Sequence, residues 1–352
     1  MDVDATTQGS AGEALADKVA FLSRPEAYPD RPARVETKET HMSWVFLTDR
    51  YAFKLKKPIR HVGQDLRSLE ARHRNALEEI RLNRRLAPDV YIGEVALTVT
   101  AGAALRLGGE GRVIDWLVQM HRLPAERMLD RLIAGERVRK ADVVRLARRL
   151  AAFYVASPPQ RITPSDYRAR FATDIAANMT ELRRPLFEMP DALSATPCRA
   201  QLDFLRRHAG LFERRVTEGR IVEAHGDLRP EHVYLGEEVA VIDCLEFNKS
   251  FRQLDPLDEL SFLAMECEGL GAASLGPLLV ATYCRAAKDR PPEGLVSFYK
   301  SYRACLRAKL CLWHLLESPV PEPSTWKARA RRYLELARVE ARRLSPLDEL
   351  DQ

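Results

Sequence analysis

The feature that most constrains this chain is a pair of polar clusters on either side of a short hairpin pattern. Residues 225–232 read HGDLRPEH and residues 241–247 read VIDCLEF. Between the clusters, the apolar runs 233–235 and 239–242 are separated by the turn sequence Gly-Glu-Glu, which predicts two strands joined by a tight turn. Such a hairpin carries Asp227 and His232 at one end and returns Asp243 beside them. Aspartates gathered in this way suit divalent-metal binding and proton acceptance, which phosphoryl transfer requires.

The two clusters resemble the catalytic loop and the metal-binding aspartate of the aminoglycoside phosphotransferase family, a branch of the protein-kinase-like fold. That family's motif runs His-Gly-Asp, four residues and Asn, with a second Asp at the far end of a hairpin. This chain keeps His225-Gly226-Asp227 and Asp243, but His232 stands where Asn is expected. The similarity runs from about Thr40 to Trp313 and includes features of an uncharacterised bacterial subgroup.

The resemblance implies an α+β, bilobal protein-kinase-like fold. Residues 1–120 would form a small N-terminal nucleotide-clamping lobe, with an antiparallel sheet and one helix. Residues 121–352 would form a larger, mostly helical lobe that carries the catalytic and acceptor-binding groups. The implied activity is an ATP- or GTP-dependent phosphotransferase that uses Mg²⁺ to move the γ-phosphate to a hydroxyl group of a small molecule. The acceptor itself does not follow from the resemblance.

The resemblance also assigns roles within the two clusters. Asp227 would be the catalytic residue that accepts or orients the hydroxyl proton, and Asp243 would bind the metal. His232 would be a second metal ligand or a hydrogen-bond donor behind the metal, since Mg²⁺ prefers oxygen ligands and imidazole favours transition metals. Glu246 would either reach the metal or cap the next segment. Asp255 resembles a family position that caps a helix and braces the catalytic loop.

A lysine-rich strand in the first third of the chain supplies the expected nucleotide contact. In the kinase-like fold, a Lys on the third strand holds the nucleotide phosphates and a Glu on the following helix orients it. Residues 51–57 read YAFKLKK, and alternation places Lys54 and Lys56 on one face. We take Lys54 as the phosphate-binding residue, with Lys56 as the runner-up. For the partner we favour Glu79 over the two other helix candidates, Glu70 and Glu78.

No glycine-rich phosphate loop occurs in this region, because the sequence from Thr37 to Leu55 contains no glycine. Nothing in the chain matches the P-loop pattern of Gly, four residues, Gly-Lys-Ser/Thr either. In the family, the first hairpin covers the phosphates without glycines, and Thr40 and Ser43 would supply hydroxyl and backbone N–H donors there. A small polar turn is the competing interpretation of these two residues.

Periodicity and turn residues predict a sheet-rich first third and a helical remainder. The expected strands are 35–39, 43–48, 51–55, 93–100, 104–107 and 113–120. The expected helices are 14–22, 66–86, 126–137, 140–156, 165–183, 198–218, 261–268, 275–287, 294–317 and 325–344.

Composition limits the remaining classes. The 352 residues include 55 Lys and Arg against 50 Asp and Glu, and the resulting charge of +5 is weak evidence for a nucleic-acid partner. Six cysteines without metal-ligand spacing fit reduced thiols in a cytoplasm. No apolar run approaches the roughly 20 residues that cross a bilayer. We therefore expect a cytoplasmic protein whose partners are a nucleotide and a small-molecule substrate, without nucleic acid or membrane; the oligomeric state stays open.

Two other functional classes account for the same residues. A transition-metal-dependent hydrolase would use His225, Asp227, His232 and Asp243 without nucleotide, but it leaves the Lys54 region without a role. A catalytically degenerate kinase-like module would bind nucleotide without turnover, with His232 marking a lost metal site.

Overall fold

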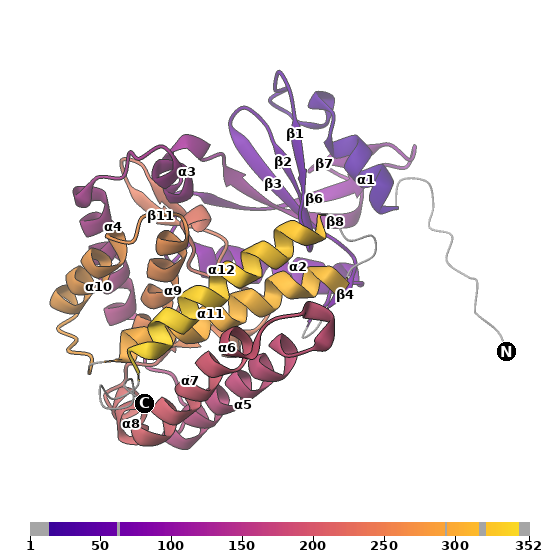
Figure 1. The fold of residues 1–352 in the computed structure, drawn as a ribbon. Helices are drawn as coiled ribbons and strands as arrows, with labels where there is room; N and C mark the ends of the chain where they lie inside the picture. Colours follow the sequence, from indigo (N-terminus) through magenta and orange to yellow (C-terminus); the bar gives the residue numbers. More distant parts are fainter. Residues whose placement is uncertain (1–13, 62–63, 293, 317–321, 345–352) are drawn as a thin grey trace. The chain divides into compact units, whose positions relative to one another are not determined.

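The computed structural model describes residues 14–61, 64–292, 294–316 and 322–344. The chain divides into two compact units (Figure 1). The first unit comprises residues 1–125 and 240–249, and the second comprises residues 126–239 and 250–352. The segment that carries Asp243 therefore belongs to the same unit as the lysine-rich strand, although almost 190 residues separate Lys54 and Asp243 in the sequence.

The first unit is built on a six-stranded antiparallel sheet with the strand order β1-β2-β3-β8-β6-β7. Its strands are β1 (Glu36–Glu39), β2 (Ser43–Leu47), β3 (Tyr51–Lys56), β6 (Tyr91–Val99), β7 (Leu105–Leu107) and β8 (Arg112–His121). The unit also contains α1 (Leu15–Leu22), α2 (Leu69–Asn83) and the two-stranded sheet of β4 (Arg60–His61) and β5 (Gln64–Asp65). All six predicted strands and both predicted helices of this region are present.

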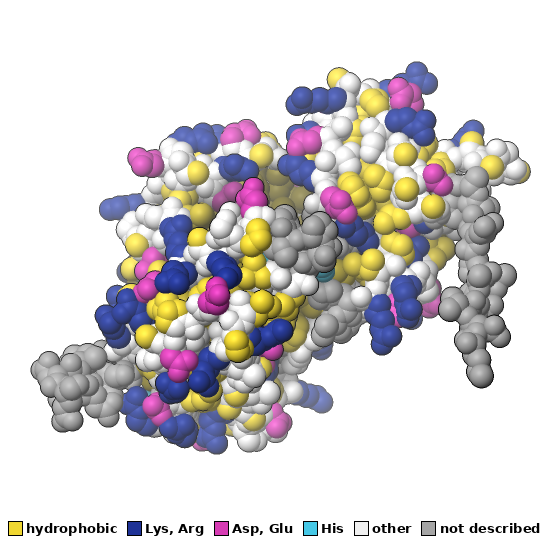
Figure 2. All heavy atoms as spheres, turned by 45° about the vertical axis from the view of Figure 1, so that its right-hand side comes forward, with side chains coloured by type: hydrophobic (Ala, Val, Ile, Leu, Met, Phe, Trp, Pro, Cys, Tyr) yellow, Lys and Arg dark blue, Asp and Glu magenta, His cyan; other side chains and the backbone are white. Residues whose placement is uncertain are grey.

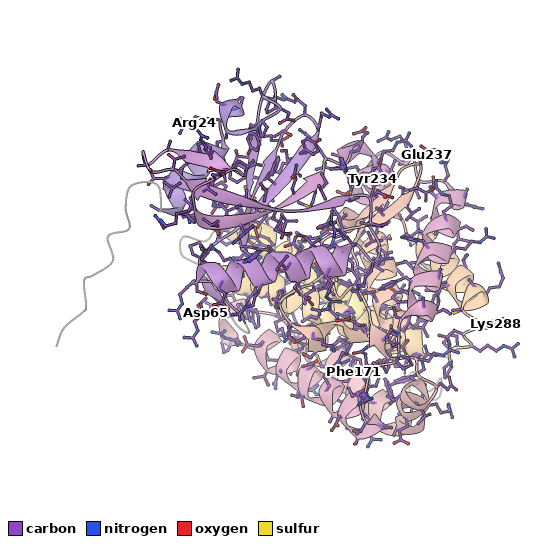
Figure 3. All side chains as sticks on the ribbon, turned by 180° about the vertical axis from the view of Figure 1, so that it is seen from behind. Arg24, Asp65, Phe171, Tyr234, Glu237 and Lys288 are labelled. Atoms are coloured by element: carbon purple, nitrogen blue, oxygen red, sulfur yellow. The ribbon has the colours of Figure 1, made fainter. Side chains whose placement is uncertain are left out.

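A buried carboxylate ties the two helices of the first unit to its sheet. The Asp115 side chain on β8 lies 2.8 Å from Lys18 Nζ of α1 and 2.7 Å from Arg72 Nε of α2. Helix α2 begins at a regular cap, because the Ser68 side chain accepts a hydrogen bond from the backbone N–H of Ala71. Figure 3 shows α2 lying along the sheet, in contact with β6 and β8. These contacts fix which face of α2 is turned towards β3.

The second unit is mostly helical. Its helices are α3 (Leu129–Ala134), α4 (Lys140–Ala156), α5 (Pro164–Leu182), α6 (Asp191–Ser194), α7 (Thr196–Arg207), α8 (Ala209–Thr217), α9 (Pro256–Gly269), α10 (Leu275–Ala286), α11 (Leu295–Trp313) and α12 (Pro323–Arg342). Aromatic rings form much of the core between α5, α8 and α11: Phe171, labelled in Figure 3, has its ring centroid 5.6 Å from Phe298 and 6.0 Å from Phe212. Of these three helices, α11 also packs against α9, which follows the second polar cluster.

Two helix predictions were wrong in this unit. The single helix expected over 198–218 is divided into α7 and α8 at His208, which has φ −112° and ψ 34°. Gly210 lies two residues further on, at the start of α8, and its low helix propensity favours a break in this region. The helix expected over 126–137 consists of a 3₁₀ turn, Ala125–Arg127, followed by the six-residue α3. Gly135 ends α3, so the apolar positions that suggested a longer helix lie in a short one.

The predicted hairpin is present. Strands β10 (Val233–Leu235) and β11 (Val239–Val241) pair with each other, and Figure 3 labels Tyr234 on β10 and Glu237 in the turn. Two further short strands, β9 (Val222–Glu223) and β12 (Gln253–Leu254), pair on either side of the two polar clusters in the sequence. This short ladder therefore fixes the points at which the chain enters the first cluster and leaves the second.

Charged side chains of both signs are interspersed on the face drawn in Figure 2, with Lys and Arg in dark blue and Asp and Glu in magenta. Within the described ranges, no helix is both long and apolar enough to cross a lipid bilayer.

Candidate active site

The first unit brings Lys54, Glu79 and Asp243 together. Lys54 Nζ lies 2.9 Å from Glu79 Oε1 and 2.6 Å from Asp243 Oδ1. Of the three helix candidates, Glu79 is the one that lies beside Lys54. The other two bind arginines on α2: Glu70 pairs with Arg74, and Glu78 pairs with Arg81. The third strand and the following helix therefore supply an ion pair at the position that the resemblance implies.

Lys56 enlarges this pair into a network. Its Nζ lies 2.6 Å from Glu79 Oε2 and 2.6 Å from Glu246 Oε1. We call Lys54, Lys56, Glu79, Asp243 and Glu246 the lysine–carboxylate cluster. Within these five residues, two ammonium groups face three carboxylates. The Asp243 side chain is 46% exposed, whereas Glu79 is 1% and Glu246 is 12% exposed, so the cluster opens to solvent at Asp243.

Burial and charge compete in this cluster, and charge decides the protonation states. Burial by itself would lower the pKa of Lys54, but the carboxylates of Asp243, Glu79 and Glu246 raise it well above its ordinary value. Burial would raise the pKa of Glu79, yet Lys54 and Lys56 hold it below its ordinary value. Both groups are therefore charged at neutral pH.

The segment that follows β11 is held by its backbone as well as by its side chains. Asp243 has a φ of 61°, an uncommon conformation for a residue other than glycine. Its N–H donates a hydrogen bond to the Tyr91 hydroxyl at 3.2 Å, and the Cys244 N–H donates to Asn83 Oδ1 at 2.8 Å. The Asn83 amide in turn donates to the Glu79 carbonyl oxygen at 2.8 Å. The end of α2 and the start of β6 thus orient the exposed carboxylate.

The two hydroxyls chosen for the first hairpin differ in their surroundings. Thr40 is exposed, and its hydroxyl closes the turn by accepting from the Ser43 N–H and donating to the Ser43 carbonyl oxygen, each at 2.9 Å. Ser43 lies directly opposite Lys56 in the ladder between β2 and β3, which places both side chains on one face. Its hydroxyl is buried and has no hydrogen-bond partner among the residues described. Ser43 therefore keeps a donor beside the lysines, whereas the Thr40 side chain already serves the turn.

In the second unit, a buried glutamate holds the backbone of the His-Gly-Asp stretch. Glu259 on α9 accepts hydrogen bonds from the N–H groups of His225 at 3.1 Å and Gly226 at 2.5 Å, and from the Tyr154 hydroxyl at 2.6 Å. Asp255 caps α9, as expected, by accepting from the Leu257 N–H at 2.9 Å. The described contacts to the loop come from Glu259, one turn further along the helix, rather than from Asp255.

Asp227 sits in a network within its own loop. Its side chain is 29% exposed, and Arg229 Nε lies 3.0 Å from its Oδ1. Arg229 also lies 2.6 Å from Glu231 Oε1, so the guanidinium joins both acids of the loop. The Asp227 N–H donates to Nδ1 of His225, which is 1% exposed. The buried His225 therefore fixes the loop backbone at Asp227, and the Asp227 carboxylate remains partly exposed to solvent.

His232 is buried and hydrogen-bonded through both of its ring nitrogens. Nδ1 donates to the Asp227 carbonyl oxygen at 2.8 Å, and Nε2 lies 3.3 Å from Arg229 Nη2. A carbonyl oxygen only accepts, so Nδ1 carries the proton and Nε2 accepts from the guanidinium. This arrangement favours a role in holding the loop over metal coordination. Among the described residues, no group of three or more His, Cys, Asp or Glu side chains is arranged to hold a metal ion.

The chain is similar in sequence to uncharacterised bacterial proteins. No family model matches the chain. Uncharacterised proteins of Mycobacterium tuberculosis and Mycobacterium bovis are each 32% identical to it over 290 residues, which cover 81% of this chain and 56% of each relative. The chain therefore spans about half the length of the curated relatives it matches.

Solved structures establish the fold. Choline kinase from Cryptosporidium parvum aligns over 95% of this chain and 99% of its own, at 10% identity and a TM-score of 0.51. The chain has a protein-kinase-like fold. A thermostable mutant of the aminoglycoside phosphotransferase APH(4)-Ia, in ternary complex with AMP-PNP and hygromycin B, aligns over 92% of this chain and 99% of its own, at 14% identity and a TM-score of 0.50. The predicted fold class, a small antiparallel-sheet lobe followed by a mostly helical one, is confirmed.

Several residues of this kinase-like fold escaped the sequence reasoning. Asn83 and Tyr91 orient the Asp243 segment, and Glu259 holds the His-Gly-Asp backbone. Lys56 was named only as the runner-up to Lys54, and its pairing with both Glu79 and Glu246 was not expected. One signal was available for Asn83, which is a polar residue on a stripe of α2 that the apolar spacing predicts to be buried. Glu259 offered no such signal, because an acid in the first turn of a helix is favourable for the helix dipole alone.

Proposed function

We propose that this chain is a phosphotransferase that moves the γ-phosphate of ATP or GTP to a hydroxyl group of a small molecule, with Mg²⁺. The observation that carries the proposal is the ion pair between Lys54 and Glu79, with Asp243 as the second partner of Lys54. A lysine that pairs with a buried glutamate and lies against a half-exposed aspartate resembles the arrangement with which kinases bind nucleotide phosphates.

In this proposal the first unit binds the nucleotide. Lys54 neutralises the phosphates, and Glu79 orients Lys54. The Ser43 hydroxyl, predicted as a phosphate donor, is buried beside Lys56, so Ser43 supports the lysine-bearing face of the sheet instead of reaching a phosphate. Thr40 contributes through the backbone of its turn. Asp243 holds the divalent cation, because its carboxylate is half-exposed and carboxylate oxygens are the ligands that Mg²⁺ prefers. The metal, when bound, offsets the negative charge that builds up on the transferred group.

The second unit supplies the acceptor chemistry. Asp227 accepts or orients the proton of the attacking hydroxyl, because its carboxylate is partly exposed while its backbone is fixed. His225 and Glu259 keep the loop rigid, and His232 holds it through the Asp227 carbonyl oxygen. Because Arg229 already contacts Asp227, it balances the charge of the base during proton transfer.

A thermal-shift panel tests the nucleotide half of the proposal. ATP, GTP and ADP are each combined with Mg²⁺, Mn²⁺ or Zn²⁺ and added to the wild type, to Asp243→Ala and to Asp65→Ala. Asp65 is the matched control, since its side chain is 44% exposed against 46% for Asp243 and it pairs with Arg67 on the surface. We expect nucleotide with Mg²⁺ to stabilise the wild type and the control, and Asp243→Ala to lose most of that gain. Equal stabilisation of all three proteins removes Asp243 from the metal site.

A turnover assay tests the catalytic half. ADP release is followed with choline and hygromycin B as hydroxyl-bearing probes, chosen because structurally similar proteins are named for or crystallised with these compounds. We expect release that depends on an acceptor and that falls about 10²–10⁴-fold in Asp227→Asn, the usual contribution of a general base. Nucleotide binding without release under any acceptor supports the degenerate module. Hydrolytic activity that needs Zn²⁺ or Mn²⁺ but no nucleotide supports the metal hydrolase.

A further inference from the structure

The lysine–carboxylate cluster contains two lysines on one strand face, and only one of them is open to a ligand. Lys54 has a side chain that is 14% exposed and contacts the solvent-facing Asp243. Lys56 is 2% exposed and contacts two acids, Glu79, which is 1% exposed, and Glu246, which is 12% exposed. A phosphate group has no route to an ammonium group enclosed in this way without breaking both ion pairs. We therefore do not expect Lys56 to bind a ligand directly, and its role lies in the ion pairs that it forms with Glu79 and Glu246.

Two parallel bridges join β3 to the segment after β11. Lys54 binds Asp243, and Lys56, two residues further along the strand, binds Glu246, three residues further along the segment. The inner bridge between Lys56 and Glu246 is enclosed, while the outer one between Lys54 and Asp243 reaches solvent. Glu79 lies behind both lysines and contacts each of them with a different carboxylate oxygen. The geometry thus separates an accessible bridge from an inaccessible one.

We propose that Lys56 is a positioning residue, whose ion pairs with Glu246 and Glu79 fix the segment 243–246 and thereby orient the Asp243 carboxylate that would hold a metal ion. Asp243 needs such support because its backbone has a positive φ, which persists only where the surroundings hold it. The part of this inference that concerns metal rests on the proposed function. The part that concerns the segment does not, and it is tested without any ligand.

Hydrogen–deuterium exchange on the ligand-free protein tests the positioning role directly. Lys56→Met keeps the aliphatic stem of the side chain and removes the charge, and Lys57→Met is the matched control. Lys57 is the next residue along the chain, and it pairs with Glu39 on the surface rather than with the cluster. We expect exchange in peptides covering 240–249 to be about tenfold faster in Lys56→Met and unchanged in Lys57→Met. Exchange at the wild-type rate in Lys56→Met overturns the proposal.

Metal dependence separates positioning from simple structural support. The Mg²⁺ concentration that gives half of the nucleotide-induced thermal shift is measured for the wild type, Lys56→Met, Lys56→Arg and Glu246→Gln. We expect Lys56→Met and Glu246→Gln to need about tenfold more Mg²⁺ at a similar maximal shift, because a less fixed segment 243–246 is less preorganised for metal binding. Lys56→Arg keeps the positive charge and is expected to need the same Mg²⁺ concentration as the wild type. A lower melting temperature with an unchanged Mg²⁺ requirement contradicts the proposal.

The two experiments keep this inference distinct from the proposed function. If no combination of nucleotide and metal ion stabilises the wild type, the proposed function fails. The amide exchange rates of residues 240–249 still decide whether Lys56 fixes the segment. If Lys56→Met does not fold, Glu246→Gln removes the same bridge while both lysines remain. Faster exchange of 240–249 in Glu246→Gln then supports the positioning role, and exchange at the wild-type rate overturns it.

Discussion

Arg215 in the second unit and Lys54 in the first are both buried cations held by two carboxylates, but they are held in different ways. Arg215 lies 2.6 Å from Asp255 and 2.6 Å from Asp289, and all three side chains are at most 3% exposed. We call these three residues the arginine hub. The guanidinium reaches each acid with two nitrogens, whereas Lys54 reaches each of its acids with a single ammonium group.

The two networks differ in their access to solvent. The arginine hub joins α8, the start of α9 and the residues after α10, and no member of it is accessible to a ligand. The lysine–carboxylate cluster ends at a half-exposed aspartate, where an ion pair is easily replaced. Burial of charge by itself therefore says little about function, and the exposure of the last member of the network is more informative.

The largest effect is expected from breaking the arginine hub. Arg215→Met leaves two aspartates buried without a counterion, and we expect the free energy of unfolding to fall by about 3–5 kcal/mol. Chemical denaturation measures this change. Arg206→Met is the control, since Arg206 is 72% exposed in its pair with Asp203, and it is expected to cost no more than about 1 kcal/mol. Similar losses in the two variants would remove the distinction between the hub and a surface pair.

A second prediction compares one acid from each network. Asp255→Asn removes the charge opposite Arg215, and we expect it to lower the free energy of unfolding by about 1–3 kcal/mol. Asp243→Asn removes a half-exposed carboxylate, so without ligand its cost should stay below about 1 kcal/mol. With nucleotide and Mg²⁺ at about 100 times the wild-type Kd, Asp243→Asn should lack most of a gain of about 2.7 kcal/mol that Asp255→Asn retains. If Asp243→Asn instead lost more stability without ligand than Asp255→Asn and retained the ligand-induced gain, Asp243 would be a structural residue.

A third prediction concerns the acid that holds the His-Gly-Asp backbone. In Glu259→Gln, the side chain keeps only one acceptor oxygen for three donors, namely the N–H groups of His225 and Gly226 and the Tyr154 hydroxyl. We expect a loss of about 1–3 kcal/mol in the free energy of unfolding, together with faster amide exchange in peptides covering 222–232. Glu268→Gln, near the end of α9, is the control and should leave exchange in 222–232 at the wild-type rate.

The smallest effect is a dependence on pH that follows from Glu79. Its pKa in the folded protein is held below the ordinary value of 4.5, so the charged form contributes stability above about pH 4.5 that is lost as the pH falls through the folded pKa. We therefore expect the wild type to lose more stability than Glu79→Gln between about pH 5 and pH 3. Melting temperatures across this window provide the measurement, and parallel curves for the two proteins would contradict the direction of the shift.

How much could be predicted from the sequence depends on the range of the interaction. The strand over 51–55 and the hairpin over 233–242 were predicted and are present as 51–56 and 233–241, because period-two alternation and turn residues act over a few positions. The Lys54–Glu79 pair was expected from resemblance and is present. The division of α7 from α8 was missed, since Gly210 acts on a helix whose apolar spacing continues across the break.

The sequence by itself determined the fold class, the face of β3 that carries the lysines and the acids that end the hairpin. Only the tertiary structure decided that Lys56 binds Glu246, 190 positions away, and that Glu259 rather than Asp255 holds the loop. The reason is that local patterns report which side of one element is apolar. Which two polar groups meet depends on the packing of separate elements, and no periodicity within either element encodes that choice.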